Sequence, residues 1–401
     1  MLMALTTGFA LSQAFRTVAA LMAPPLQQAF GLTPRELGLF AGVFHFAFGA
    51  LQLVMGLLID WIGPRRTVLA VFPLAIFGAM LTAMADSFTG LVIGQALTGI
   101  GCAPAFLVCT VFIARQFPAQ QFAQVSGATL GIGSVGLLLT GTPLAWIIEA
   151  ASWRAGFLAL AACAALAWLA IWLLVREAPP PADAPRPSIG QALRGYRELF
   201  RLPFTWGIVG LGLFTYASFL ALRGLWLGPL LVDRHGFSLV ASGHVALAVS
   251  VVGMVGPPVF GRLDPGDARR RGWILWSALA TVIMYAAMAF DPGAWVDVAL
   301  ALVMSVVAGF IVLQYADVRA AYPPQMTGRA MAVFTMSMFL GVALMQWLTG
   351  VVASVAATWG VDVYAAVLGS IVLVLGLGAT LFRWLPAPAH TRGAQAAQSG
   401  S

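Results

Sequence analysis

Two arginines stand inside long apolar stretches of the sequence. Arg16 lies in MLMALTTGFALSQAFRTVAALMAPPL, and Arg223 lies in FLALRGLWLGPLL. An arginine at the centre of a bilayer costs about 2.5–3.5 kcal/mol on insertion scales, and it usually faces a cavity with a partner. A planar guanidinium donates two parallel hydrogen bonds, which suits a carboxylate or a phosphate. The two residues therefore predict a binding site for a small anion.

Other polar side chains in apolar stretches are candidates for the same cavity. Gln13 lies about one helical turn before Arg16, and Tyr216 lies two turns before Arg223 on the same face. His45 is the best candidate for a group that titrates near neutral pH. The remaining candidates are Gln314, Tyr315, His244 and Gln346. Each of these side chains could instead form a packing hydrogen bond, so both interpretations stay open.

Acidic side chains that could neutralise the two arginines are scarce in the apolar stretches. Glu149 and Asp317 lie near the ends of such stretches, and we place the other acids in the connections. We therefore expect the negative charge to arrive with a bound ligand. The alternative is that the arginines only donate hydrogen bonds to backbone carbonyls.

The composition places the chain in a membrane. Of the 401 residues, 61% are hydrophobic and 9% are charged, whereas about 25% are charged in soluble domains. Apolar runs of about 20 residues, each long enough to cross a ~30 Å hydrocarbon core, recur along the whole chain. The net charge of +7 comes from arginines beside these runs, which is typical of membrane topology rather than of nucleic-acid binding.

We predict an all-α polytopic membrane protein with twelve spans. The predicted spans are 4–30, 37–60, 67–85, 89–114, 122–148, 154–175, 204–232, 239–262, 272–290, 294–318, 328–354 and 361–384. The start, MLMALTTGFALSQAF, has no positive n-region and no convincing cleavage site, so we expect a first span rather than a signal peptide. With the loop after span 2 in the cytoplasm, only Arg35, Arg154 and Arg234 fall outside, which is a strong positive-inside bias. We therefore predict a multi-pass protein of a bacterial inner membrane with both termini in the cytoplasm.

The polar segments divide the chain. We predict a six-helix bundle at 1–175, a cytoplasmic linker at 176–202, a second six-helix bundle at 203–385 and a cytoplasmic tail at 386–401. The linker contains REAPPPADAPRPS, whose prolines prevent a regular helix. IGQALRGYRELFR follows and is typical of an amphipathic helix at the lipid headgroups.

The second half of the sequence echoes the first at an offset of about 205 residues. GLLIDWIGPRR at 56 corresponds to GRLDPGDARRR at 261, which pairs Asp60 with Asp264. FPAQQFAQVSGATLGIGSVGL at 117 corresponds to YPPQMTGRAMAVFTMSMFLGV at 322, which pairs Gly136 with Gly341. Several matches at one offset predict two pseudo-symmetric halves. Parallel repeats of this kind occur in transporters whose substrate site lies near the bilayer midplane.

The sequence resembles the major facilitator superfamily over the whole chain: six plus six spans, a central loop, and the loop after span 2. The family pattern in that loop is Gly-x-x-x-Asp-Arg-x-Gly-Arg-Lys/Arg. Here Trp61 stands where the family usually has Arg, and Pro64 displaces the basic pair by one position. SWRAGF, at 152–157, is also similar to the family.

The resemblance implies a cytoplasmic gate. The Asp60 carboxylate would face the positive N-terminal end of span 11, and Arg65 and Arg66 would add charge-assisted hydrogen bonds across the seam. Asp264 and its neighbouring arginines would act in the same way against the start of span 5. The predicted gating residues are Gly56, Asp60, Gly63, Arg65, Arg66, Asp264, Arg270 and Arg329. The alternative is that these charges only fix the topology.

A narrower resemblance concerns the substrate. FRTVAALMAPPL at 15–26 is similar to span 1 of organophosphate:phosphate antiporters, in which an Arg precedes a Pro by eight positions, as Arg16 precedes Pro24 here. In that family this Arg and a second one in span 7 grip the phosphate. Arg223 precedes Pro229 by only six positions, and two residues turn a helix by about 200°. The resemblance implies transport of a phosphate ester or another organic anion by alternating access.

Several other classes of function remain as alternatives. Gln95 stands where the superfamily often has an Arg associated with proton coupling, which counts against proton-driven antiport. The methionines near span 11, with Cys102 and Cys109, would suit copper uptake, although methionine at helical spacing usually fills a core. Efflux of a hydrophobic drug is the other transport alternative, and a receptor on the same scaffold is a third class. We expect no enzyme activity, no cofactor, no metal centre and no nucleic-acid partner, and we expect a monomer in the lipid bilayer that binds a small solute and a coupling ion or counter-anion.

Overall fold

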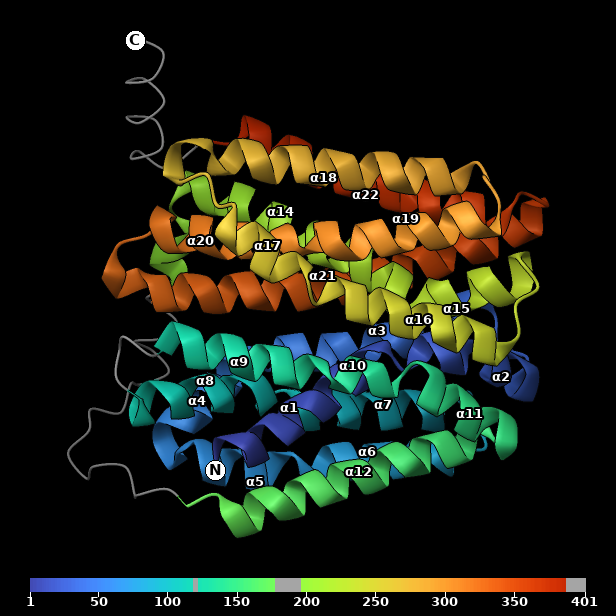
Figure 1. Ribbon diagram of the computed structural model, residues 1–401, viewed down its shortest axis with the longest axis horizontal. Coiled ribbons are helices and arrows are strands. Elements are labelled where there is room, and N and C mark those ends of the chain that lie inside the picture. Colours follow the sequence, from blue (N-terminus) through green and yellow to red (C-terminus); the bar gives the residue numbers. More distant parts are fainter. Residues whose placement is uncertain (118–121, 177–195, 387–401) are drawn as a thin grey trace. The chain divides into compact units, whose positions relative to one another are not determined.

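The computed structural model describes residues 1–117, 122–176 and 196–386, and these residues form helices and short connections without a β-strand. The first half has twelve helices (Figure 1). They are α1 (Leu2–Thr17), α2 (Ala19–Phe30), α3 (Pro34–Ala50), α4 (Gln52–Ile62), α5 (Pro64–Val71), α6 (Pro73–Ala83), α7 (Phe88–Cys102), α8 (Ala105–Gln116), α9 (Phe122–Ser134), α10 (Gly136–Leu139), α11 (Thr142–Ala150) and α12 (Trp153–Leu174).

The second half continues the pattern and adds short non-α turns inside its spans. Its elements are α14 (Pro203–Ala221), η2 (Leu222–Trp226), α15 (Leu227–Pro229), η3 (Leu230–Arg234), α16 (Leu239–Gly253), α17 (Gly256–Arg262), α18 (Asp267–Ala289), α19 (Ala294–Val307), η4 (Ala308–Phe310), α20 (Ile311–Ala321), α21 (Pro324–Trp359) and α22 (Val363–Trp384). The prediction of an all-α membrane fold is confirmed.

Eleven helical stretches in the described part of the chain are long and apolar enough to cross a membrane. The predicted first span is not among them, and it is divided into α1 and α2. Val18, between them, keeps helical dihedral angles (φ −60°, ψ −34°), so the chain continues in the same direction. Pro24 and Pro25 lie inside α2 and remove two donors from the helical hydrogen-bond ladder. Span 1 is therefore an interrupted helix.

The chain divides into two compact units. Among the described residues, unit 1 contains 1–176, 222–248 and 346–351, and unit 2 contains 196–221, 249–345 and 352–386. The predicted bundles at 1–175 and 203–385 stay a prediction, because unit 1 also includes parts of the second half. Most of the predicted linker and nearly all of the tail lie outside the described residues. Residues 196–200 are helical, with Leu199 buried and Arg197 exposed, which is the amphipathic pattern predicted there.

Unit 1 relies on close backbone contact between helices. The helix pair α6 and α7 packs through glycines, since a Cβ at Gly78 would lie 2.5 Å from the Gly94 carbonyl oxygen. A Cβ at Gly99 of α7 would lie 2.4 Å from the Phe44 carbonyl oxygen of α3. Helices in lipid gain little from the hydrophobic effect, so close packing at small residues replaces it.

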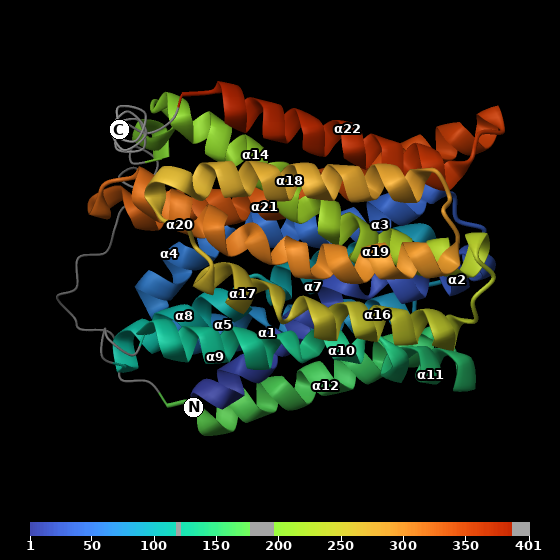
Figure 2. The ribbon, with the colours of Figure 1, turned by 45° about the horizontal axis from the view of Figure 1, so that its top comes forward.

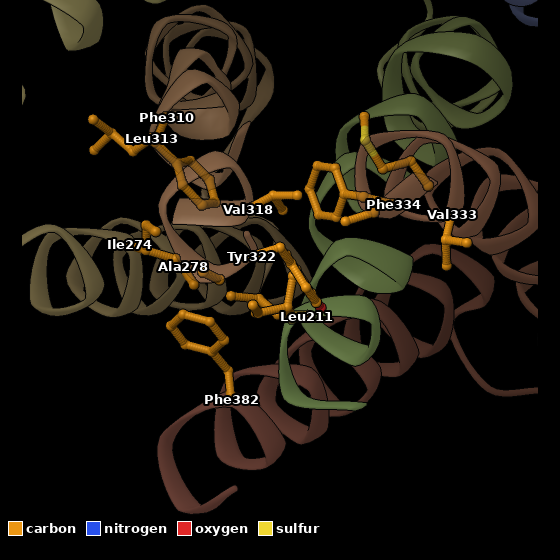
Figure 3. Close-up of a cluster of buried hydrophobic side chains, with 14 of the residues drawn as sticks. Leu211, Ile274, Ala278, Phe310, Leu313, Val318, Tyr322, Val333, Phe334 and Phe382 are labelled. Atoms are coloured by element: carbon orange, nitrogen blue, oxygen red, sulfur yellow. The ribbon is translucent and has the colours of Figure 1, made fainter. Parts of the chain in front are cut away.

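Unit 2 has an apolar core to which several of its helices contribute. The core includes Leu211 from α14, Ile274 from α18, Leu313 from α20, Phe334 from α21 and Phe382 from α22, and Figure 3 shows these side chains pointing toward one another. Along the edge of this unit, α18 and α22 run side by side (Figure 2). The core therefore joins spans that are far apart in the sequence.

The two glycines that the sequence repeat pairs have the same environment. A Cβ at Gly136 would lie 1.7 Å from the Ala10 carbonyl oxygen, within unit 1. A Cβ at Gly341 would lie 1.7 Å from the Leu213 carbonyl oxygen, within unit 2. In both cases a glycine lets two spans of one unit touch through their backbones, which gives a physical reason for glycine at both repeat positions.

Gly136→Ala should therefore destabilise the protein. The added methyl group would overlap the Ala10 carbonyl oxygen and force α1 and α10 apart, at a cost of about 1–3 kcal/mol. The matched control is Gly131→Ala in α9, where a Cβ would meet nothing within 4 Å and where alanine improves helix propensity. The thermal unfolding midpoint in detergent should fall for Gly136→Ala only. Equal midpoints for the two variants would contradict the packing argument.

Candidate functional site

Arg16 is buried near the end of α1, with 6% of its surface exposed. Its guanidinium donates hydrogen bonds to the Gln13 side chain and, at 3.4 Å, to the Ser12 hydroxyl, and it lies 4.6 Å from the centre of the Phe48 ring. These groups are neutral, so they orient the guanidinium without cancelling its positive charge. Gln13, one helical turn before Arg16, thus contacts it within α1, and its predicted role in binding a substrate stays a prediction.

His45 lies close to Arg16. The ring is 1% exposed in α3, and its Nδ1 lies 3.2 Å from the Ala41 carbonyl oxygen. The charge of Arg16 acts on the ring, and the side chain of Gln346 interacts with it. The helix α7 contributes Cys102, which is fully buried near Arg16 and Ser12. Unit 1 thus gathers polar groups from α1, α3 and residue 346 around one buried cation.

Arg223 also belongs to unit 1 and is 2% exposed. It lies in the π-helical turn η2, and its guanidinium donates a long hydrogen bond of 3.5 Å to the Leu137 carbonyl oxygen. A π-turn adds one residue to a helical turn, which rotates the side chains by roughly 100° from their α-helical directions. The sequence-based estimate of the direction of Arg223 assumed a regular α-helix, whereas Arg223 lies in a π-turn; its predicted contact with a substrate stays a prediction.

The turn η2 is fixed by contacts on both sides. The Trp226 indole donates a 2.8 Å hydrogen bond to the Thr349 hydroxyl, and both side chains are buried. A Cβ at Gly228 would lie 1.8 Å from the Ala20 carbonyl oxygen. Pro24, four residues after Ala20, has no N–H to bond this oxygen. The interrupted first span and the π-turn of span 7 therefore meet where both helices are irregular.

The predicted site residues Tyr216, Gln314 and Tyr315 belong to unit 2, whereas the further candidates His244 and Gln346 lie in unit 1. The Gln314 side chain accepts a 3.0 Å hydrogen bond from the Thr215 hydroxyl. The Tyr315 hydroxyl lies 3.3 Å from the Thr335 hydroxyl and contacts the Met338 sulfur. Tyr216 packs edge-on against Phe339. Arg16, Gln13 and His45 are thus brought together in unit 1, which also contains Arg223, whereas Tyr216, Gln314 and Tyr315 form hydrogen bonds and ring contacts within unit 2.

The predicted gating loop of the first half joins α4 to α5. Gly56 and Asp60 lie in α4, although the Asp60 side chain is outside the described residues. Gly63 has φ +87°, a backbone conformation that favours glycine,. Arg65 donates hydrogen bonds to the Val175 and Trp172 carbonyl oxygens at the end of α12, at 2.5 and 3.1 Å. Arg65 therefore caps the negative end of a helix in its own unit.

Arg66, which follows directly, is exposed. The proposed hydrogen bonds of Arg65 and Arg66 across the cytoplasmic seam stay a prediction.

The corresponding loop of the second half contains an ion pair. Arg270 donates a 2.7 Å hydrogen bond to Asp264 and a further one to Asp267. The hydrogen bond from Arg270 holds the pKa of the Asp264 carboxyl below its usual value. Arg271 caps the Phe382 carbonyl of α22 at 3.0 Å and lies 3.7 Å from Asp317. Arg271 thus repeats in unit 2 the helix-capping contact that Arg65 makes in unit 1.

Arg329, the last predicted gating residue, lies half-buried in α21. Its predicted role as part of the gate stays a prediction.

Some residues of the site escaped the sequence analysis. Phe48 is an ordinary aromatic side chain of α3, and only the fold brings it to Arg16. Ser12 lies four residues before Arg16 on α1, so helical spacing was the available signal for it,. Outside this site, in unit 2, Asp297 was assigned to a connection, but it lies in the first turn of α19 and is 1% exposed. The preceding Gly293 has φ +99°, and glycine before an acidic residue at the start of an apolar run was the available signal for a helix start there.

The fold and the buried cations define a class: an all-helical membrane transport protein with two related sets of spans. Residues 5–312 match the sequence model of the Major Facilitator Superfamily. The chain therefore belongs to the Major Facilitator Superfamily, and the resemblance seen in its loop motif is confirmed.

Known relatives are similar over much of their length. The chain is 25% identical to a probable sulfoacetate transporter, SauU, of Cupriavidus necator, over 68% of this chain and 67% of that protein. It is 24% identical to a hexuronate transporter of Bacillus subtilis, over 60% of this chain and 58% of that protein. It is 25% identical to a D-galactonate transporter of Escherichia coli, over 84% and 85% of the two chains.

Solved structures share the fold. A D-xylose-proton symporter has a TM-score of 0.74 at 16% identity and covers 97% of this chain and 98% of its own. A bacterial homologue of the human lysosomal transporter Spinster, in an inward-facing and occupied conformation, has a TM-score of 0.74 at 16% identity, over 95% of each chain. At these identities the likeness concerns the fold alone.

Thr349→Val should weaken the attachment of η2. The valine keeps the shape of the side chain but leaves the buried Trp226 N–H without this acceptor, which costs about 1–3 kcal/mol. Thr358→Val is the control, because Thr358 is exposed on the same helix and bonds only to Val355 of that helix. Thermal unfolding in detergent should separate the two variants, and a Thr349→Val protein as stable as the control would refute the role of this hydrogen bond.

Proposed function

We propose that the chain is a secondary transporter that carries a small organic anion across the membrane by alternating access. The observation that carries the proposal is the burial of two arginines, Arg16 and Arg223, in one compact unit at 6% and 2% exposure. A cation within a membrane span has a high free-energy cost, and such residues usually have a partner or a functional role there. A guanidinium is well suited to binding an anionic ligand, because its planar set of donors matches the geometry of a carboxylate or a phosphate.

The relatives support an organic acid as the substrate. Their names give sulfoacetate, hexuronate and D-galactonate. All three carry a carboxylate, and two of them add several hydroxyl groups. The arginines would bind the carboxylate, and Gln13 and His45 beside Arg16 would accept or donate hydrogen bonds to hydroxyl groups. The residues from unit 2, Gln314, Tyr315 and Tyr216, are proposed to line the rest of the site.

Alternating access is supported by the contacts inside unit 1. The unit joins the first half of the chain to residues 222–248 and 346–351 of the second half. One Glu149 carboxylate oxygen from α11 accepts a 3.1 Å hydrogen bond from the Val240 N–H at the start of α16. By the predicted topology this seam lies on the external side. We infer that these contacts hold the external side closed and break when the halves rock.

The cytoplasmic gate is proposed at the other end. Gly56, Asp60, Gly63 and Arg66 in the first half would meet Arg329 of span 11, and Asp264 with Arg270 would meet span 5. The caps that Arg65 and Arg271 form within their own units would keep each loop in place while the seam opens. The proposed location remains a bacterial inner membrane with both termini in the cytoplasm.

Copper uptake and drug efflux are not favoured. Met338 lies in the apolar core of unit 2, and Met326 and Met331 pack against that core. The Cys109 thiol donates to the Ala105 carbonyl of its own helix. These methionine and cysteine side chains pack inside the protein. In addition, the relatives named above are transporters of organic acids.

Arg16→Ala should abolish transport of an organic anion into proteoliposomes. Hydrogen bonds to a charged group are worth about 1.5–3 kcal/mol, so binding should weaken about 10- to 150-fold. Arg16→Lys should retain partial activity, because it keeps the charge but loses the two parallel donors. The panel contains sulfoacetate, D-galactonate and D-glucuronate, with neutral D-galactose for comparison.

Arg35→Ala is the matched control for the loss of one positive charge, since Arg35 is exposed, and it should transport like the wild type. If folded wild-type protein carries none of the anions, the anion proposal fails, and copper and cationic drugs become the next substrates to measure.

Glu149→Gln should favour opening on the external side. The change keeps the shape of the side chain and removes the negative charge at the start of α16, which is worth about 0.3–1 kcal/mol, or a two- to fivefold shift. The readout is the rate at which a membrane-impermeant thiol reagent modifies Thr142→Cys, in a chain without its three native cysteines, because Thr142 is buried beside Gly243. A rate unchanged by Glu149→Gln would count against the closing role of this contact.

A further inference from the structure

The ends of three helices of unit 2 lie together. Arg271, near the start of α18, donates a 3.0 Å hydrogen bond to the Phe382 carbonyl oxygen near the end of α22. A Cβ at Gly207, near the start of α14, would lie 3.2 Å from the Cβ of Leu385, directly after the end of α22. We call these three helix ends the α14–α18–α22 junction. By the predicted topology the junction lies at the cytoplasmic surface of the bilayer.

Each of the three helix ends carries an exposed arginine. Arg201 lies just before α14, Arg269 lies in the first turn of α18, and Arg383 lies in the last turn of α22. Within the described part of the chain, none of these three guanidinium groups forms a hydrogen bond or an ion pair. Their donors are therefore available to a ligand that approaches from outside the protein.

The acidic residues beside the junction do not cancel this positive charge. Asp264 and Asp267, before and at the start of α18, both pair with Arg270. Glu198 is exposed three residues before Arg201, and among the described residues it forms no ion pair. Glu198 offsets at most one of the three charges, so the described part of the junction keeps an excess of positive charge that attracts an anion.

Exposed tryptophans lie at the same three helices. Trp384, at the end of α22, is 83% exposed, Trp276, two turns after Arg269 in α18, is 71% exposed, and Trp206, at the start of α14, is 55% exposed. Indole rings are enriched where lipid headgroups meet the acyl chains. The junction therefore combines free guanidinium groups with side chains that are typical of the headgroup region of a membrane.

Apolar side chains continue from the junction along α18 and α22. Leu373, Leu377 and Leu381 of α22 are exposed at intervals of four residues, and Ile283 of α18 is exposed seven residues after Trp276. Residues at these intervals share one face of a helix. The two helices run side by side (Figure 2). Each helix thus presents an apolar face along which an acyl chain can lie.

The segment that carries Arg201 is attached to the other two helix ends. Leu199, two residues earlier, is 1% exposed and belongs to the same apolar core as Ile274 of α18 and Phe382 of α22. Its carbonyl oxygen accepts a 2.8 Å hydrogen bond from the Thr205 hydroxyl of α14. The backbone of the junction is therefore formed before any ligand binds, which lowers the entropic cost of binding.

We propose that the α14–α18–α22 junction binds an anionic phospholipid of the surrounding leaflet, with phosphatidylglycerol as the model lipid. The three arginines bind the headgroup phosphate, because a guanidinium donates two parallel hydrogen bonds to a phosphate. The tryptophans flank the headgroup, and the acyl chains lie along the apolar faces of α18 and α22. This site does not depend on which solute the protein carries.

The test measures the thermal unfolding midpoint of the full chain in detergent as phosphatidylglycerol is added. One variant combines the three substitutions Arg201→Gln, Arg269→Gln and Arg383→Gln. Phosphatidylethanolamine is the comparison lipid, because its ammonium group cancels the charge of its phosphate.

A matched control variant loses the same number of charges from the same predicted side. It combines Arg176→Gln, Arg262→Gln and Arg319→Gln, which replace exposed arginines at the ends of α12, α17 and α20. A third variant replaces the three junction arginines by lysine, which keeps the positive charges and loses the planar donors.

Phosphatidylglycerol should raise the midpoint of the wild type more than phosphatidylethanolamine does. In the glutamine variant of the junction, the phosphatidylglycerol concentration that gives half of the shift should rise about 100-fold, since each basic side chain near an anionic lipid contributes about fivefold. The control variant should match the wild type. The lysine variant should respond at concentrations closer to those of the wild type than to those of the glutamine variant.

An unchanged response of the glutamine variant to phosphatidylglycerol would overturn the proposal. An equal loss in the control variant would also overturn it, because the effect would then come from total charge, and so would equal shifts with the two lipids. The three side chains are exposed, so the midpoint without lipid should match the wild type. If it does not, Arg383→Gln alone replaces the triple variant, with an expected weakening of about fivefold.

Discussion

The burial of positive charge inside membrane-spanning helices is the constraint on which the rest of this structure depends. Arg16 and Arg223 are each almost fully buried, and a membrane makes such charges costly. The chain surrounds Arg16 with neutral groups, the Gln13 amide, the Ser12 hydroxyl and the Phe48 ring. These contacts orient the guanidinium and preserve its charge, which is what recognition of an anion requires.

Placing those arginines requires irregular helices. Span 1 is interrupted at Val18 and carries two prolines, and span 7 contains the π-turn in which Arg223 lies. Both irregular segments meet at the Ala20 carbonyl and Gly228. Elsewhere the spans are held by regular, close contacts at glycine. The contrast is physically consistent, since departures from helical geometry are tolerated in membranes where neighbouring protein groups replace the lost hydrogen bonds.

The sequence repeat corresponds to repeated physical contacts. Gly136 and Gly341 each touch a carbonyl oxygen of another span of their unit. Arg65 and Arg271 each cap the last helix of their half, at the Trp172 and Phe382 carbonyls respectively. These contacts fix the loops that follow the second span of each half. The loops contain the residues proposed to gate the cytoplasmic side. Hydrogen bonds that hold each loop in place within its own unit are consistent with that role.

The sequence by itself determined the membrane class, the helical fold, the repeat and the two buried arginines. Each of these features depends on local composition or spacing. Apolar runs determine the spans, and a charged residue inside such a run can be identified from the sequence alone. The loop motif and the matched offsets likewise predicted the Major Facilitator Superfamily. The pairing of Gln13 with Arg16 also followed from sequence, because residues three apart share a helix face.

Only the tertiary structure decided which side chains surround the arginines and how the spans bend. Phe48 carries no distinctive signal, and its contact with Arg16 comes from the approach of α3 to α1. The direction of the Arg223 side chain depends on a π-turn, whose hydrogen bonds span one residue more than those of an α-helix. The pattern of apolar residues does not indicate this turn. Such features arise from the packing of whole helices against one another, which periodicity within any single segment does not encode.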